Sequence, residues 1–243
     1  MSKKQEIMRK VDPGKIKMAG IVSIVSHQFK TPLAIIKGYL EVLLSGDCGE
    51  INVSQREYLS DALENVKRMS CLIENLLDIS RIEEGQFKVK LRAVALEKIT
   101  EQVLKNLSTW IKANNCDIVL KKPKRLPRVL ADPDKICQVV QNLVTNAVIY
   151  KTSRGKVEIT LKKVNKEVLF ICKDNGVGIS RKDFDRVFSK FYRSEDAIEL
   201  NPSGSGLGLY ISKAIIELSK GKIWFTKNKK RGTVVTFSLS VAD

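Results

Sequence analysis

Residues 168–179 of the 243-residue chain read Val-Leu-Phe-Ile-Cys-Lys-Asp-Asn-Gly-Val-Gly-Ile, and our interpretation starts from this stretch. Its apolar first half is typical of a buried β-strand, which ends at the carboxylate of Asp174. The glycines Gly176 and Gly178 follow, and glycine lets a backbone approach a flat ring closely. A carboxylate placed there can accept a hydrogen bond from an exocyclic amine such as that of adenine. The same residues also fit an ordinary turn, because Asp-Asn-Gly is common turn chemistry.

The patterns around this stretch predict an α+β domain. The strand patterns at 156–164 and 167–174 are joined by Asn165-Lys166 and predict a β-hairpin. Ser180 and Asp183 match a capping box that would begin a helix. The elements do not alternate as repeated βαβ units, which favours α+β over α/β. We expect further strands near 87–92, 116–120, 222–227 and 232–240, and helices near 95–113, 133–149 and 207–219.

Two asparagines share one face of the helix expected at 133–149. Asp132 suits its N-cap and Pro133 suits its first turn. Asn142 and Asn146 are four residues apart, so they lie on the same side, although asparagine is a mediocre helix former. Two stacked amide oxygens can hold a hard cation such as Mg²⁺ together with substrate phosphates. Two amides that face solvent would explain the same residues equally well.

A glycine-rich stretch, Gly-Ser-Gly-Leu-Gly-Leu at 204–209, opens the helix expected near 207–219. Backbone N–H groups at a helix N-terminus bind phosphate. The spacing matches neither G-x-x-x-x-G-K-[ST] nor G-x-G-x-x-G, which excludes a P-loop and a Rossmann turn.

The first 84 residues predict two long helices, 16–45 and 55–82, joined by a loop at 46–52. Apolar residues of the second helix recur at three-four spacing and form a face that needs a partner. Two such hairpins can pair as a four-helix bundle, so we predict a homodimer. The residues of this face are Leu59, Ala62, Val66, Met69, Ile73 and Leu76.

The start of the second helix carries its own signal. Ser54 and Glu57 match a capping box. Val53 and Tyr58 match a hydrophobic staple.

His27 is the only histidine and lies in Val-Ser-His-Gln-Phe-Lys-Thr-Pro-Leu at 25–33. Its neighbours on the helix face are small or short, which leaves the imidazole accessible to another domain. Pro32 removes one helix hydrogen bond and should bend the helix. Considered alone, a single histidine on a helix also fits a surface or capping residue. The small or short neighbours are Gly20, Ser23, Thr31, Ala34 and Gly38.

The net charge of +16 comes entirely from the second part of the chain. Residues 1–84 carry 12 basic and 12 acidic residues, whereas residues 85–243 carry 31 and 15. A basic domain can meet nucleic acid, anionic lipid, polyphosphate or an acidic protein. Basic clusters at 121–125 and 227–231 have no helix-turn-helix or aromatic stacking pattern beside them, so we do not expect nucleic acid as a partner.

Cysteine usage and hydropathy indicate a soluble, cytoplasmic protein. The five cysteines are at least 21 positions apart, which excludes a sequence-local zinc site, and they suit a reducing compartment. No apolar run approaches the ~18 residues of a membrane span. Membrane attachment would therefore depend on a missing N-terminal region.

Taken together, these elements resemble the catalytic core of a bacterial two-component sensor histidine kinase, over nearly the whole chain. Residues 27–33 look like the H box and 142–147 like the N box. Residues 174–179, 188–193 and 204–209 look like the G1, F and G2 boxes, in the order and spacing of that family.

The resemblance implies a HisKA-type dimerisation and phosphotransfer hairpin at 16–84, after a basic segment at 1–15. A Bergerat-type ATP-binding sandwich would follow at 85–243. It implies transfer of the ATP γ-phosphoryl group to His27 Nε2, and then to an aspartate of a response regulator.

The resemblance also implies roles for single residues. Asn146 would bind Mg²⁺ with support from Asn142, and Thr31 would position water when the regulator is dephosphorylated. Residues near 190–205 would form a mobile ATP lid. Asp174 would contact adenine. The other residues implied at the ATP site are Gly176, Gly178 and Ile179 by the ring, and Gly204, Gly206, Leu207, Gly208 and Leu209 by the phosphates.

Two positions depart from the family pattern. The residue after the phospho-acceptor is usually acidic, but Gln28 cannot act as a carboxylate base. We therefore predict slow autophosphorylation, with a phosphatase-biased regulatory member as the alternative. Ile149 stands where the family often has a basic residue, and we expect Lys151 to reach the ATP phosphates instead.

Overall fold

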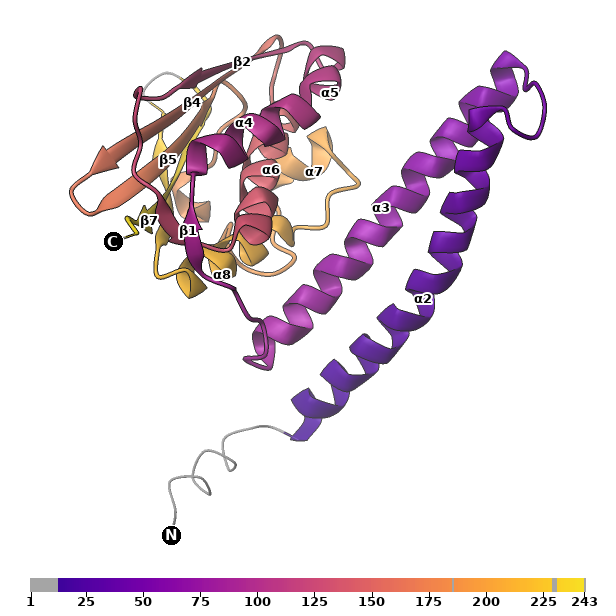
Figure 1. Ribbon diagram of the computed structural model, residues 1–243, viewed down its shortest axis with the longest axis horizontal. Coiled ribbons are helices and arrows are strands. Elements are labelled where there is room, and N and C mark those ends of the chain that lie inside the picture. The colour runs from indigo at the N-terminus through magenta and orange to yellow at the C-terminus, as the bar shows by residue number, and fades with distance from the viewer. Residues whose placement is uncertain (1–12, 185, 229–230, 243) are drawn as a thin grey trace. The chain divides into compact units, whose positions relative to one another are not determined.

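The computed structural model describes residues 13–184, 186–228 and 231–242, without the side chains of residues 13–24, 27 and 227 (Figure 1). The chain divides into two compact units, residues 1–87 and 88–243. The basic segment expected at 1–15 lies mostly outside the described residues.

The first unit is a helical hairpin, as predicted, made of α2 (Pro13–Ser45) and α3 (Val53–Glu83). Helix α2 continues through Pro32. An ion pair between Lys30 and Glu74, 3.5 Å long, joins the two helices on their exposed side. Leu33 and Val66 are buried in the hairpin.

The predicted cap of the second helix is wrong by two residues. Asn52 is the N-cap, and its side chain accepts a hydrogen bond from Gln55 N at 2.8 Å, while the Gln55 side chain accepts from Asn52 N at 2.9 Å. An asparagine side chain can cap a helix as a serine can. The capping box is therefore formed by Asn52 with Gln55, and not by Ser54 with Glu57. The expected staple is also absent, because Val53 and Tyr58 are 75% and 77% exposed.

The hairpin leaves a large apolar surface in water. These side chains are on both helices and are at least one-third exposed, although their spacing is that of a packed core. They include Met69 and Leu76 of the predicted face of α3, with Leu72 beside them, and Val25, Phe29, Ile35, Ile36, Tyr39, Val42 and Leu43 of α2.

The second unit is built on a five-stranded sheet in the order β2-β4-β5-β7-β6. Strand β2 pairs with β4 in parallel and all other neighbours are antiparallel. The predicted hairpin at Asn165-Lys166 is confirmed, because Val164 pairs with Glu167 across it. The strands are β2 (Cys116–Lys121), β4 (Gly155–Val164), β5 (Glu167–Asp174), β6 (Lys222–Lys227) and β7 (Thr233–Ser240).

A second, two-stranded sheet differs from our expectation. The strand expected at 87–92 is instead β1 (Arg92–Val94), which pairs with β3 (Val129–Ala131). We did not predict β3, because three residues are too few to show a strand period.

Helices cover one face of the five-stranded sheet (Figure 1). Helix α6 (Pro133–Ile149) matches its predicted bounds, and α8 (Gly208–Leu218) lies within its predicted range. The helix expected at 95–113 is broken at Leu107 into α4 (Leu96–Asn106) and α5 (Ser108–Ala113). A 3₁₀ turn (Arg181–Asp183) and α7 (Glu195–Leu200) complete the unit.

The core lies between these helices and the sheet. Alternate residues of β4 and β5 face it, and Phe170 of β5 stacks on Phe237 of β7 with ring centroids 4.8 Å apart. The predicted α+β sandwich is therefore confirmed. Within the described ranges, no helix has both the length and the apolar character that a membrane crossing requires.

The corrected cap can be tested with a matched pair of variants. Asn52→Ala removes the side chain that accepts from Gln55 N, so we expect a loss of about 1 kcal/mol in the free energy of unfolding. Ser54→Ala should change it by less than about 0.5 kcal/mol. Urea unfolding at one protein concentration measures both, and a larger loss for Ser54→Ala would restore the original prediction.

Candidate functional site

Asp174 ends β5 on the face of the sheet that the helices cover, and its carboxylate organises the chain around it. Its Oδ1 accepts hydrogen bonds from Gly176 N at 2.8 Å and Thr233 N at 3.0 Å. Its main-chain oxygen accepts from Asn228 Nδ2 at 2.9 Å. Burial raises the pKa of the Asp174 carboxyl, and the backbone hydrogen bonds from Gly176 and Thr233 offset only part of that rise. A ligand that donates to this carboxylate would therefore supply an interaction that the buried charge lacks.

The glycines after Asp174 are required by close packing of backbones. A Cβ on Gly176 would lie 2.3 Å from the carbonyl oxygen of Tyr150, at the end of α6. Gly178 has φ +85°, and a Cβ there would lie 3.2 Å from the Gly232 oxygen. We had expected these glycines to make room for a ring. The structure shows that they also make room for the backbones of Tyr150 and Gly232. Ile179 follows and is half-buried.

Helix α6 brings both predicted asparagines to its half-buried side. Asn142 Nδ2 donates to Ser212 Oγ of α8 at 3.0 Å. A Cβ on Gly208, the first residue of α8, would lie 2.2 Å from Asn142 Oδ1. Asn142 and the glycine-rich stretch are therefore in direct contact, although 66 positions separate Asn142 from Gly208. Asn146 lies one helical turn further along α6.

The N-terminus of α6 is held by a charged cap, as predicted. Asp132 Oδ1 accepts from the backbone N–H groups of Asp134 and Lys135, and Oδ2 accepts from Lys90 N. Burial alone would raise the pKa of Asp132, but these three hydrogen bonds outweigh it and the pKa is lowered.

We call residues 190–205 the lid segment. Arg193 links several of its turns through hydrogen bonds, which the sequence did not lead us to expect. The Arg193 guanidinium donates to the main-chain oxygens of Pro202 and Gly204 at 3.1 and 3.0 Å, and also to those of Ala197 and Asn201. A Cβ on Gly204 would lie 3.1 Å from its Cζ. One side chain, two positions before α7, thus contacts both α7 and the glycine-rich stretch. An arginine shortly before the Pro-Ser-Gly-Ser-Gly stretch at 202–206 could have indicated such a role, because a guanidinium can satisfy several carbonyls of a turn.

The turns before the lid segment also differ from our expectation. Ser180 makes no side-chain cap, so the predicted capping box with Asp183 is wrong. Asp183 is 4% exposed and instead accepts from Tyr192 Oη at 2.6 Å. That hydrogen bond raises the pKa of Tyr192. Asp183 therefore anchors the residue beside Arg193.

The glycine-rich stretch bends sharply before α8. Gly206 has φ +68°, and a Cβ there would lie 2.8 Å from the Phe191 carbonyl carbon. Leu207 is buried, at 4% exposed, and Leu209 is half-buried. The structure thus places 204–209 between the lid segment and Asn142.

The residues of the expected H box lie on α2. Gln28 and Thr31 are exposed. His27 is within the helix, but its side chain lies outside the described part of the chain.

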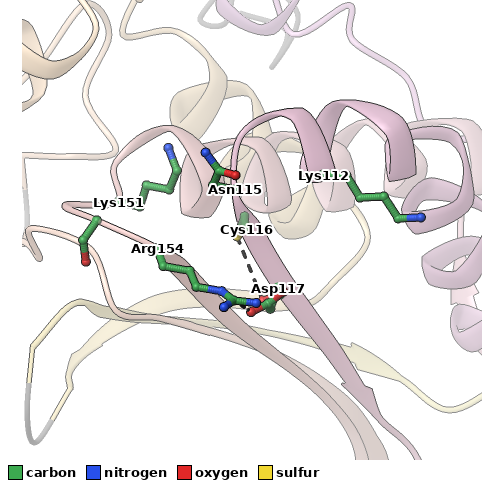
Figure 2. Close-up of a pocket in the computed structure, with 7 residues that line it drawn as sticks. Lys112, Asn115, Cys116, Asp117, Lys151 and Arg154 are labelled. Atoms are coloured by element: carbon green, nitrogen blue, oxygen red, sulfur yellow. Dashed lines mark hydrogen bonds and ion pairs between the residues drawn. The ribbon is translucent and has the colours of Figure 1, made fainter.

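In the second unit, Lys151 lines a cavity together with residues that our sequence analysis did not assign to the ATP site (Figure 2). With Arg154 and Asp117 it lines a cavity of about 640 Å³ where β2 and β4 begin. A Cβ on Gly155 would lie 2.9 Å from Lys151 Cδ. Arg154 pairs with Asp117 at 2.9 Å. No contact described here joins Lys151 to the asparagines of α6, so its role toward phosphate stays a prediction.

The basic cluster at 121–125 is partly neutralised. Lys121 pairs with Glu158 at 2.6 Å, and Lys122 pairs with Glu101 at 2.5 Å. These ion pairs weaken the electrostatic argument for a nucleic-acid surface.

Comparison with known proteins agrees with this arrangement. Residues 17–85 match the His Kinase A (phospho-acceptor) domain, and residues 131–243 match the histidine kinase-, DNA gyrase B-, and HSP90-like ATPase family. The sensor histidine kinase WalK of Bacillus subtilis is 30% identical over 220 residues, which are 90% of this chain and 36% of WalK. A WalK of Staphylococcus aureus is 30% identical over 221 residues, or 52% of its length. The chain therefore spans about a third to a half of these curated relatives.

Solved structures show the same fold. Full-length ShkA in complex with AMPPNP has a TM-score of 0.74 at 23% identity, covering 92% of this chain and 46% of ShkA. The Acinetobacter baumannii histidine kinase AdeS has a TM-score of 0.62 at 25% identity. The match covers 89% of this chain and 98% of the AdeS chain. The chain belongs to the two-component sensor histidine kinases, of which it carries the phospho-acceptor and ATPase domains.

Proposed function

We propose that this chain transfers the γ-phosphoryl group of ATP to His27 and then to an aspartate of a response regulator. The observation that supports this most strongly is the convergence of three predicted motifs in the second unit. They converge on α6: Asn142 contacts Gly208 of the stretch 204–209, and Gly176, which bonds to Asp174, packs against Tyr150 at the end of α6.

Asp174 fits the recognition of adenine. Its carboxylate is half-buried and its pKa is raised by desolvation, so the charged form gains from any donor that reaches it. The exocyclic amine of adenine is such a donor. The hydrogen bonds from Gly176 and Thr233 both end on Oδ1 and hold the carboxylate in one orientation.

The stretch 204–209 and α6 fit the phosphates. The first backbone N–H groups of α8, from Gly208 onward, have no intrahelical partner and favour an anion. Among the described residues, no group of three or more His, Cys, Asp or Glu side chains could hold a metal ion. Mg²⁺, bound mainly by the phosphates, would neutralise their charge, and Asn146 is the amide that we assign to it.

His27 supplies the nucleophile. A neutral imidazole is competent near pH 7. Its Nε2 lone pair would form a bond to the γ-phosphorus as the bond to the β,γ-bridging oxygen breaks, which releases ADP. The phosphoryl group then moves to a carboxylate oxygen of the regulator, and His27 is restored. Positioning and charge neutralisation carry most of such a reaction.

The apolar surface of the hairpin supports a homodimer. Tyr39 and Phe29 of α2 are 69% and 49% exposed, and Met69 of the predicted face of α3 is 47% exposed. A second hairpin would cover this surface and complete a four-helix bundle. We also propose a cytoplasmic location, where ATP and response regulators are found, with any membrane attachment through a region preceding this chain.

Incubation with γ-labelled ATP and Mg²⁺ tests the proposed reaction. We expect label on the protein that is acid-labile and alkali-stable, and its loss in His27→Ala. The chain has one histidine, so the assignment is unambiguous. An unlabelled protein whose melting temperature still rises with ATP would contradict the kinase activity and leave a nucleotide-regulated phosphatase or scaffold.

Gln28 favours a second candidate function, a member biased toward dephosphorylation of its regulator. Its exposed amide, next to His27, can orient the imidazole but cannot take a proton.

Gln28→Glu should raise the autophosphorylation rate at least about tenfold, because general base help is typically worth ~10²–10⁴. The initial rate of labelling at saturating ATP measures this effect. Lys30→Gln, two residues further on and also exposed, is the control and should leave the rate within about twofold. An unchanged or lower rate for Gln28→Glu would show that another group accepts the proton.

A further inference from the structure

Ser212 is a buried hydroxyl on the core-facing side of α8. It is 2% exposed, and Ile211, Ile215 and Ile216 around it are also buried. A hydroxyl in such surroundings is costly unless it has a hydrogen-bond partner. The Ser212 Oγ has one, because it accepts from Asn142 Nδ2 at 3.0 Å.

The other end of the same amide meets Gly208. A Cβ there would lie 2.2 Å from Asn142 Oδ1 and 2.9 Å from Cγ, so only glycine leaves room for the amide. Gly208 and Ser212 are four residues apart and therefore share one face of α8. Together they form what we call the amide clamp: Gly208 supplies the space and Ser212 supplies the hydrogen bond.

The clamp also sets which way the amide points. Gly208 is the first residue of α8, where backbone N–H groups lack intrahelical partners and carry partial positive charge. An amide oxygen is favoured on that side and an amide nitrogen is disfavoured. With the nitrogen bonded to Ser212, the oxygen of Asn142 faces the helix N-terminus.

We propose that Ser212 is a positioning residue, which orients the Asn142 amide and so couples the glycine-rich stretch to the Mg²⁺-bearing side of α6. This inference rests on the function proposed above. Asn142 lies one turn before Asn146, and α8 continues directly from 204–209. A rotated Asn142 amide would therefore disturb both the phosphate-binding N-terminus and the cation that Asn146 helps to hold.

A purely structural role for Ser212 makes a different prediction. Alanine has a higher helix propensity than serine, which offsets part of the cost of the lost hydrogen bond. A structural hydroxyl would thus affect melting temperature and not the reaction. A positioning hydroxyl affects the turnover and its Mg²⁺ dependence in a domain that is still folded.

Ser212→Ala should lower the autophosphorylation kcat about tenfold at saturating ATP and Mg²⁺, as expected when a half-buried donor loses its partner. It should also raise the Mg²⁺ concentration needed for half-maximal rate. The matched control is Ser219→Ala. Ser219 is equally buried, at 1% exposed, near the other end of α8, but it donates to its own helix at Ile215 O, 2.8 Å away. Its kinetic constants should match the wild type.

Titration of each variant with AMPPNP, with and without Mg²⁺, separates this inference from the proposed function. We expect Ser212→Ala to lose most of the Mg²⁺-dependent gain in affinity that the wild type and Ser219→Ala keep. That loss supports the amide clamp even if neither the wild type nor any variant becomes labelled with γ-labelled ATP. Absence of labelling would contradict only the proposed kinase activity. Equal kcat and equal Mg²⁺-dependent affinity in Ser212→Ala and Ser219→Ala would overturn the inference.

Discussion

The half-buried carboxylate of Asp174 is the constraint on which the second unit depends. Its Oδ1 bonds to Gly176 N and Thr233 N, and its main chain bonds to Asn228, so one residue joins the end of β5, the following turn and the start of β7. Backbones can converge there only because Gly176 and Gly232 lack side chains. The charge is buried at a cost, as the raised pKa of Asp174 shows. A site of this kind is stabilised by a ligand that donates to it.

A second convergence, between α6 and α8, has the same physical character. Asn142 is placed by a glycine and a hydroxyl on the facing helix, as Asp174 is placed by backbone N–H groups. In both places a polar side chain is oriented by contacts within the protein and has further bonding capacity toward a ligand. The Arg193 contacts give the lid segment a similar internal order. Such preorganisation suits phosphoryl transfer, which depends on positioning and electrostatics.

The sequence predicted those features that have a local signal. Asp132-Pro133 marked the start of α6, and the alternation around Asn165-Lys166 marked the β4–β5 hairpin. Two predictions were wrong because the sequence allows more than one hydrogen-bonding arrangement. Asn52 and Ser54 can both cap α3, and Asp183 can either cap a turn or accept a hydrogen bond from Tyr192. The strand β3 and the break at Leu107 depend on tertiary packing. The motifs indicated which residues form the site, but the contact of Asn142 with Gly208 joins distant segments and needed the structure.

We propose that Asp174 recognises adenine, and the assignment of the ATP site rests most directly on this residue. Calorimetric titration with the Mg²⁺ complexes of ATP and GTP, on the wild type and on Asp174→Asn, tests it. We predict that the wild type prefers ATP at least about tenfold, because guanine presents an acceptor where adenine presents a donor. Asp174→Asn, which keeps Oδ1 and its two hydrogen bonds, should lose most of that preference. Equal affinity of the wild type for the two nucleotides, or a preference that survives in Asp174→Asn, would contradict the account.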